Sequence, residues 1–372
     1  MIRDLTDDEA RAALPLKWET PGVIPAWVAE MDYAHAPAIT DALVAAIRAG
    51  RLGYPPHEDE VGAAFAGFAA RHWSWQVPAE ACVPAGGVIG GIRLVLELLC
   101  PPGPVVVQMP SYPPFRDVVE LTGRTVVPIT VDPDADDAAL DLAAVEQAFA
   151  AGARTLLLCN PHNPLGRVST REELVALAEL ARSYGARVVT DEVHGPLTLT
   201  GSRFTPYLSV DEHAVLVTSA TKSFNMPAVH GALVVALDPE DRARLLEAPI
   251  PAQNSWSSLG VVGRAVAWRD CDDWHAALVE RLSAQRDLLV DLVADRLPRA
   301  RMRPLQATYL AWLDLRAYGV DDPAWAGLAH GVRVAPGQDY QPGLPGHVRV
   351  NIATSPERLE RIVDGLAAAL AE

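Results

Sequence analysis

The chain has 372 residues, half of them hydrophobic and about a fifth charged, with a formal net charge of −16. This length and composition predict a folded protein with a large core and a smaller companion domain, and they exclude wholesale disorder. The acidic balance, which no run of Lys or Arg offsets, argues against nucleic acid and anionic membranes as partners.

No stretch reaches the roughly 18 to 20 consecutive apolar residues that a membrane span needs, and the start lacks the basic and apolar regions of a signal peptide. We therefore expect a cytoplasmic protein. Four cysteines, at positions 82, 100, 159 and 271, show no metal-ligand spacing. We interpret them as buried apolar residues rather than as disulfides or metal ligands.

The first 40 or so residues are rich in Trp and Pro and do not fit a sheet pattern, so we expect them to pack on a second domain. The middle of the chain instead predicts strands that alternate with helices, which build a largely parallel sheet covered on both faces. The strand signals are short apolar runs without polar alternation, typical of strands buried on both sides. They occur at 105–107, 125–127, 155–158, 187–190, 215–218 and 233–235.

Helix signals fall between these runs and after them. Residues 171–184 predict a helix that opens with a capping box of Thr170 and Glu173 and closes at Gly185. Helical spacing extends from about 256 to 297, and strand-like pieces follow at 307–314 and 347–353. We expect an α/β protein with a large domain over 45–260 and a smaller α+β domain built from 1–44 and 261–372.

Unusual polar groups follow three of the predicted strands. Asn163 follows the run at 155–158, Asp191 and His194 follow the next, and Lys222 follows the run at 215–218. The carboxyl ends of neighbouring parallel strands meet at one sheet edge, where ligands of open α/β sheets bind. Taken singly, each residue also has a purely structural interpretation, as a turn, a cap, a half-buried histidine or a solvated lysine.

Together these residues meet the needs of one cofactor, pyridoxal phosphate. Its aldehyde needs a lysine amine for a Schiff base, and its pyridine nitrogen needs a carboxylate. Its phosphate needs hydroxyls and backbone N–H groups, such as those at the N-terminus of a helix. Lys222, Asp191, Ser219 and the Gly86–Gly87 pair before a helical run at 88–99 fit these roles.

Several motifs make the chain similar to a known family over nearly its whole length. It resembles the fold-type I pyridoxal-phosphate enzymes of the class I/II aminotransferase superfamily, and within them the cystathionine β-lyase branch of the MalY/PatB type. The segment 27–33, WVAEMDY, is similar to the Trp-x-Ala-Asp-Met-Asp-Phe signature of that branch. Further matches are LGYP at 52–55, DEVH at 191–194 and KSFN at 222–225.

The resemblance implies a cofactor role for each matching position. Lys222 would carry the Schiff base, Asp191 would hold the protonated pyridine nitrogen, and Asn163 would bond the phenolic oxygen with His194 nearby. Tyr112 would stack on the ring and take part in catalysis. The residues implied around the phosphate are Gly87, Val88, Ser219 and Thr221.

The resemblance also implies substrate and subunit contacts. Arg349 would grip the substrate's α-carboxylate, and Trp27 and Tyr33 would contact the substrate, with Tyr33 at the entrance side of the site. Tyr54 would reach the phosphate of a neighbouring subunit, which implies a homodimer with shared active sites. The chain departs from the common pattern at Glu30 and Tyr33, where Asp and Phe are usual, and at His230, where many aminotransferases have an arginine.

Three functions follow from this resemblance. The first is a carbon–sulfur β-lyase that cleaves cystathionine or a related cysteine S-conjugate to a thiol, pyruvate and ammonia. The second is an aminotransferase acting on an amino acid of a specialised pathway, because it needs the same Lys222, Asp191 and Arg349. The third is a regulatory protein that keeps the cofactor pocket.

Overall fold

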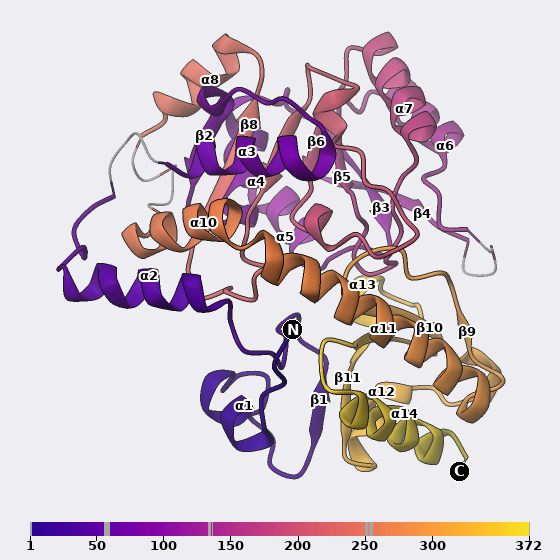
Figure 1. Ribbon diagram of the computed structural model, residues 1–372. Helices are drawn as coiled ribbons and strands as arrows, with labels where there is room; N and C mark the ends of the chain where they lie inside the picture. The colour runs from indigo at the N-terminus through magenta and orange to yellow at the C-terminus, as the bar shows by residue number, and fades with distance from the viewer. Residues whose placement is uncertain are drawn as a thin grey trace.

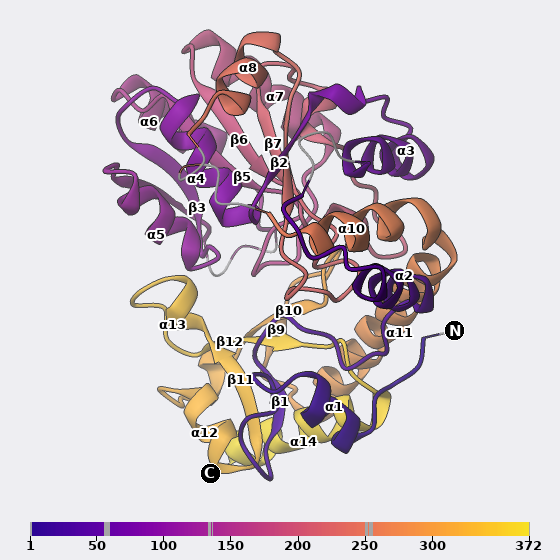
Figure 2. The ribbon, with the colours of Figure 1, turned by 90° about the vertical axis from the view of Figure 1, so that its left-hand side faces the viewer.

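The computed structural model describes the chain in six stretches and shows two sheets with separate cores (Figure 1). The described residues are 2–55, 60–132, 135, 137–249, 252 and 256–371. Figure 2 shows the larger sheet and its helices above the smaller sheet, beside which both chain ends lie.

The larger sheet has seven strands in the order β2-β8-β7-β6-β5-β3-β4. Of its seven strands, β8 alone runs opposite to the other six, so the predicted, largely parallel sheet is confirmed. All six predicted strands form, and the sequence misses β2, a four-residue strand that contains a proline. The strands are β2 (Cys82–Ala85), β3 (Val105–Met109), β4 (Val126–Thr130), β5 (Thr155–Cys159), β6 (Arg187–Asp191), β7 (Val215–Thr218) and β8 (Ala232–Ala236).

Both faces of this sheet are buried, because successive side chains of each strand point to opposite sides. Leu156 and Leu158 of β5 pack in one core, and Leu157 packs in the other. The first core is covered by α2 (Pro37–Arg48), α3 (Val61–Trp73), α6 (Leu142–Ala150), α7 (Arg171–Ser183) and α10 (Ser258–Asp270). The second is covered by α4 (Val88–Leu98), α5 (Pro114–Leu121) and α8 (Pro239–Leu246).

Two local features place helices as the sequence indicates. The capping box of Thr170 and Glu173 forms at the start of α7, and Gly185 takes the left-handed conformation just after the helix. Gly91 lets α4 lie close to the sheet, because an added Cβ would be 3.0 Å from Val217 Cγ1 and 3.2 Å from Val234 Cγ2. This close packing holds the N-terminus of α4 beside the ends of β7 and β8.

The smaller sheet has five strands in the order β1-β11-β12-β10-β9. As predicted, the N-terminal residues pack on this unit, and β1 pairs with β11 at its edge. Its strands are β1 (Ile24–Ala26), β9 (Arg301–Met302), β10 (Leu310–Asp314), β11 (Val332–Pro336) and β12 (His347–Asn351). Its helices are α1 (Asp7–Ala13), α11 (Asp272–Arg296), α12 (Pro323–Ala329), α13 (Gly337–Tyr340) and α14 (Pro356–Ala371).

The division into two domains stays a prediction, but its boundaries do not match the packing. The boundary at 260/261 falls inside α10, whose Val261, Ala265 and Trp268 belong to the core of the larger sheet. The boundary at 44/45 likewise falls inside α2, which packs on α10. The predicted helical stretch at 256–297 is two helices that meet at Cys271, and a boundary there fits the packing better.

The remaining sequence expectations concern cysteines, metals and membranes. None of the four cysteines forms a disulfide, and all but Cys82 are buried. Across the described ranges, no group of three or more His, Cys, Asp or Glu side chains could hold a metal ion. Among the described helices, none combines the length and the apolar character that a bilayer span requires.

Candidate active site

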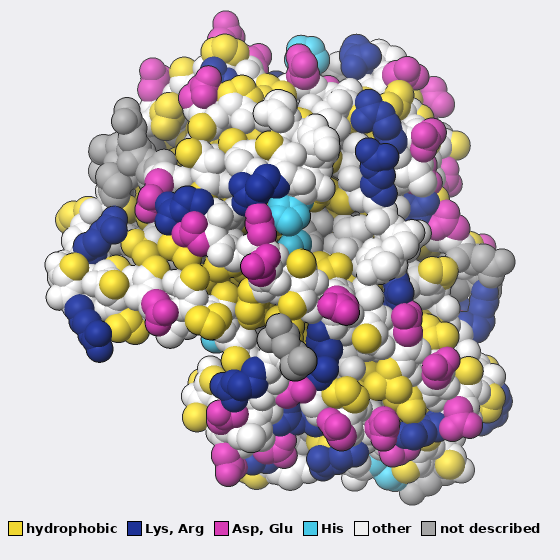
Figure 3. Space-filling model, in the orientation of Figure 1, with side chains coloured by type: hydrophobic (Ala, Val, Ile, Leu, Met, Phe, Trp, Pro, Cys, Tyr) yellow, Lys and Arg dark blue, Asp and Glu magenta, His cyan; other side chains and the backbone are white. Residues whose placement is uncertain are grey.

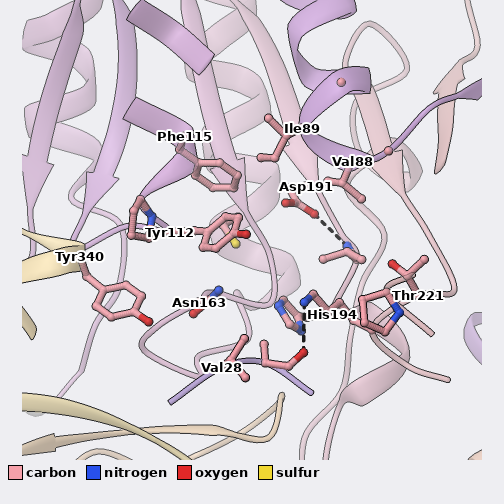
Figure 4. Close-up of a pocket in the computed structure, with 18 of the residues that line it drawn as sticks. Val28, Val88, Ile89, Tyr112, Phe115, Asn163, Asp191, His194, Thr221 and Tyr340 are labelled. Carbon is pink, nitrogen blue, oxygen red and sulfur yellow. Dashed lines mark hydrogen bonds between the residues drawn. The ribbon is translucent and has the colours of Figure 1, made fainter. Parts of the chain in front are cut away.

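A cavity of about 680 Å³ lies where the carboxyl ends of the larger sheet meet the smaller sheet. Figure 4 shows Asp191, Tyr112, Asn163 and His194 directed toward a common space, with Tyr340 and Thr221 on opposite sides of it. The parallel register of β5, β6 and β7 produces this meeting of strand ends. The predicted residues that line the cavity are Trp27, Gly87, Val88, Tyr112, Asn163, Asp191, His194, Thr221, Lys222 and Arg349.

Asp191 is the last residue of β6 and is 4% exposed. One carboxylate oxygen, Oδ1, accepts a hydrogen bond of 3.0 Å from the Val193 N–H. Burial raises the pKa of Asp191 to about 7, because this hydrogen bond and the positive charge of Lys222 offset only part of the desolvation. A buried carboxylate in this state is a strong binding partner for a cation placed in the cavity.

Lys222 is half-buried and donates a hydrogen bond of 3.2 Å from Nζ to the carbonyl of Ala29. Burial lowers the pKa of Lys222 to about 8, and the Arg349 guanidinium adds to this effect. The sequence contains only one other lysine, Lys17. Lys17 is 1% exposed, and its Nζ lies 2.9 Å from both Asp32 Oδ1 and the Glu30 carbonyl. Lys222 is therefore the lysine whose amine is available in the cavity.

Trp27, Val28 and Ala29 line the cavity and begin a wall segment, residues 27–32, whose carbonyls are held by buried side chains. Lys222 shares the Ala29 carbonyl with Tyr309 Oη, which donates a hydrogen bond of 3.0 Å. Asn351 Nδ2 donates to the carbonyls of Val28 and Glu30, at 2.7 and 2.6 Å. This segment contains most of the family signature, and its contacts explain why that stretch needs a defined backbone position.

Asn225 fixes the end of the same wall from the loop that follows Lys222. Its side chain accepts from the N–H of Met31 and donates to the Met31 carbonyl, both at 2.8 Å. Asn225 itself has a φ of +53°, a left-handed conformation that asparagine tolerates. The wall and the lysine loop are thus held as one unit.

Arg349 lies on β12, is 4% exposed, and faces the cavity from the smaller sheet. Nη2 donates to the Trp27 carbonyl at 2.6 Å, and Nη1 donates to Asn163 Oδ1 at 3.1 Å. Its guanidinium carbon lies 4.9 Å from the centroid of the Tyr340 ring. Arg349 lines the cavity, where its guanidinium can meet a carboxylate, and its buried Nε has no hydrogen-bond partner within the described chain.

Asn163 can still take its predicted role toward a ring oxygen. Its Oδ1 is occupied by Arg349, which leaves the two amide N–H donors of Nδ2 for an acceptor in the cavity. His194 is buried beside it, and desolvation together with the charges of Lys222 and Arg349 lowers the pKa of His194 to about 3. This imidazole is therefore neutral at physiological pH.

The N-terminus of α4 opens into the cavity and can bind an anion. Its N-cap is Gly87, no side chain caps the first turn, and Gly87, Val88 and Ile89 all line the cavity. The unpaired N–H groups of such a turn, reinforced by the helix dipole, favour a phosphate. Thr221 and His230 line the cavity as well.

Three predicted site residues do not line the cavity. Ser219 is buried, and its Oγ donates to the Gly231 carbonyl at 2.7 Å and accepts from the Thr221 N–H at 3.2 Å. Tyr33 is not at the entrance, because packing against the smaller sheet buries its ring completely and its Oη donates to the Thr354 carbonyl at 2.9 Å. Tyr54 is fully exposed.

Sequence reasoning missed the residues that support Arg349 and Lys222. Tyr309 and Tyr340 reach them through contacts between distant parts of the chain, which no local pattern reveals. Asn351 could have been predicted, because it stands two residues after Arg349 and therefore lies on the same face of β12.

The arrangement fits the cofactor that the sequence resemblance implies. A buried carboxylate without a cationic partner, an available amine and an uncapped helix N-terminus meet the needs of its ring nitrogen, aldehyde and phosphate. The cavity also falls within the roughly 300–1,000 Å³ that is usual for ligand pockets.

Comparisons with known proteins agree with this geometry. A Mycobacterium leprae protein provisionally named a cystathionine β-lyase is 38% identical, with 95% of this chain and 94% of that protein aligned. The cystathionine β-lyase PatB of Bacillus subtilis is 30% identical, with 96% of each chain covered. A crystal structure from Corynebacterium diphtheriae, provisionally described as a pyridoxal-phosphate-dependent β-cystathionase, superimposes with a TM-score of 0.95 at 31% identity over 100% of both chains.

The profile of one protein family, aminotransferase class I and II, matches residues 22–366. The match takes in both sheets and every residue that lines the cavity. The chain therefore belongs to the class I and II aminotransferase family, and it has the fold of the pyridoxal-phosphate enzymes of fold type I.

Proposed function

We propose that the protein is a pyridoxal-phosphate-dependent carbon–sulfur β-lyase, which cleaves L-cystathionine or a related cysteine S-conjugate to a thiol, pyruvate and ammonia. The observation that carries this proposal is the available Lys222 amine in one cavity with the Asp191 carboxylate and the Arg349 fork. The full-length similarity to proteins named as cystathionine β-lyases supports elimination as the reaction type.

The cofactor would be held by residues already described. Lys222 would form its covalent link, Asp191 would face its ring nitrogen, and the N-terminus of α4 would receive its phosphate. Tyr112 would lie against the ring, and Asn163 would donate to its phenolic oxygen. When bound, pyridoxal phosphate supplies a protonated ring that accepts the electron pair left on the substrate's α-carbon.

The protein's own side chains would bind the substrate and move its proton. Arg349 would hold the α-carboxylate through its guanidinium, and Tyr340 and Asn163 would keep the fork in place. The released Lys222 amine would take the proton from the α-carbon, for which a pKa of about 8 is close to ideal near neutral pH. The wall at 27–32 would keep this amine near the α-carbon through the Ala29 carbonyl.

The remaining chemistry is an elimination followed by hydrolysis. The Cβ–S bond breaks, and the sulfur leaves with the bonding electron pair as a thiolate. The three-carbon fragment then takes up water and yields pyruvate and ammonia. The same proton abstraction would serve an aminotransferase, so the fate of the substrate must be measured.

We also propose that two subunits form a homodimer with shared active sites. Tyr54 is 100% exposed, and Leu52 and Ile47 beside it are 66% and 50% exposed. Figure 3 shows further hydrophobic side chains over α2. A second subunit would bury this surface, and Tyr54 of each subunit would then reach the cofactor phosphate of the other. The cytoplasmic location stays a prediction from the sequence.

The test is the product ratio from L-cystathionine with the purified protein. A lyase should release pyruvate and homocysteine in equal amounts without an added keto acid. Strict dependence on a keto acid, with the cofactor cycling to its amine form, would make the protein an aminotransferase. Borohydride reduction followed by peptide mass spectrometry should find the cofactor on Lys222, and an adduct on Lys17 or none would refute the assigned site.

A further inference from the structure

The cavity contains one charged side chain for which the proposed function has no use. Its charged lining residues are Asp191, Lys222, Asp339 and Arg349. The first two serve the cofactor and Arg349 serves the α-carboxylate, which leaves the Asp339 carboxylate. Within the part of the chain that the structure describes, this carboxylate makes no hydrogen bond or ion pair.

The position of Asp339 is fixed by its surroundings. It belongs to α13, the short helix that follows β11, and its backbone carbonyl accepts a hydrogen bond of 2.8 Å from Arg116 Nη2. Gly337 packs α13 against β12, since an added Cβ there would lie 2.8 Å from the His347 carbonyl oxygen. The next residue, Tyr340, is the one that stacks on Arg349. These contacts fix the backbone of Asp339 in the cavity wall, next to the residue that stacks on the substrate-binding fork.

The electrostatics of this wall favour a cation near Asp339. Desolvation raises the pKa of Asp339, and the positive charges of Arg349 and Arg116 offset only part of that effect. An ammonium group on a substrate would supply the missing partner, whereas a second carboxylate would be repelled. The two ends of a bound amino acid would then meet opposite charges, Arg349 at the α-carboxylate and Asp339 at the end of the side chain.

We infer that Asp339 forms a subsite for a cationic group at the far end of the substrate's side chain. The site then prefers cysteine S-conjugates whose distal group is an ammonium over conjugates whose distal group is neutral or anionic. L-Cystathionine carries a distal ammonium beside a second carboxylate, and its ammonium would be the group that faces Asp339. This inference rests on the proposed function for its substrate class.

The test compares three conjugates of similar length that differ in terminal charge. They are S-(2-aminoethyl)-L-cysteine, S-(2-hydroxyethyl)-L-cysteine and S-carboxymethyl-L-cysteine, and pyruvate release gives kcat/KM for each. Because Asp339 is solvent-accessible, we expect the aminoethyl compound to exceed the hydroxyethyl compound by about three- to fivefold, with the carboxymethyl compound lowest. Asp339→Asn should bring the first ratio close to one, and Asp339→Lys should favour the carboxymethyl compound.

A charge-matched control variant and a binding measurement complete the design. Asp117→Asn removes an exposed carboxylate from α5 that does not line the cavity, so it should keep the wild-type ratio. L-Lysine and 6-hydroxy-L-norleucine replace the sulfur by CH2 and cannot eliminate, and calorimetry on the cofactor-loaded protein should show the same preference in Kd.

Two kinds of failure can be told apart. If no conjugate yields pyruvate but L-lysine still binds more tightly than 6-hydroxy-L-norleucine in an Asp339-dependent manner, the proposed reaction is wrong and the subsite stands. Equal dissociation constants for the two analogues, or a preference that survives Asp339→Asn, would overturn the subsite.

Discussion

The buried pair of Lys17 and Asp32 gives a quantitative test of how the cavity wall is built. Both side chains are 1% exposed, and Lys17 also holds the Glu30 carbonyl within the wall. Lys17→Met keeps most of the aliphatic packing but leaves the Asp32 carboxylate without its cation. Breaking a buried ion pair in this way costs about 3–5 kcal/mol of the free energy of unfolding. That is a large share of the roughly 5–15 kcal/mol that stabilises a typical domain.

A second variant separates the lost charge partner from lost packing. Asp32→Asn in the Lys17→Met background removes the uncompensated charge, while its amide oxygen can still accept from Trp18 Nε1, as Asp32 Oδ1 does at 2.9 Å. The double variant should therefore be more stable than Lys17→Met alone. Urea unfolding followed by circular dichroism and tryptophan fluorescence measures both. A loss below about 1 kcal/mol for Lys17→Met, or a double variant no more stable than the single one, would refute the reasoning.

Three further predictions concern the cofactor site and the subunit that shares it. Asp191→Asn should still bind the cofactor but lose most turnover, because a neutral amide cannot pair with a protonated ring nitrogen as an anion does. Each ~1.4 kcal/mol added to the activation barrier slows turnover tenfold. Turnover close to that of the wild type would contradict this role. The rate at which the cofactor-free protein captures pyridoxal phosphate should rise with a midpoint near pH 8, since only the neutral Lys222 amine attacks and its pKa is lowered to about 8. Absorbance measures that rate, and a midpoint near the ordinary lysine pKa of 10.5 would disprove the lowered value. Mixing inactive Lys222→Ala and Tyr54→Phe subunits should restore part of the activity, because one site of a hybrid dimer is intact only if Tyr54 acts across the interface; a protein that sediments as a monomer would remove the idea.

The sequence predicts the parts of the fold that depend on local patterns. The ends of β5, β6 and β7 carry Asn163, Asp191 and Lys222 to one edge because strands joined by helices run parallel, so that their carboxyl ends point the same way. The capping box of α7 is likewise a contact between residues three apart. Such signals need no knowledge of distant partners.

Contacts between distant segments could not be predicted. Ser219 turns its hydroxyl toward Gly231 because β8 lies next to β7, and a motif alone does not give that direction. Tyr33 is buried because the smaller sheet packs around it, although its motif lies beside the cavity. Periodicity identified α10 as a helix but not the core in which it is buried, so the predicted domain boundary fell inside it.

The scarcity of lysine has a practical consequence for work with this protein. Of the 31 Lys and Arg residues, only Lys17 and Lys222 are lysines, and Lys17 is buried in an ion pair. Apart from a chain-terminal amine, an aldehyde or an activated ester in solution meets one accessible primary amine, that of Lys222. Labelling at Lys222, located by peptide mass spectrometry, therefore reports how many sites are free of cofactor, and coupling chemistry that needs surface lysines has none to use.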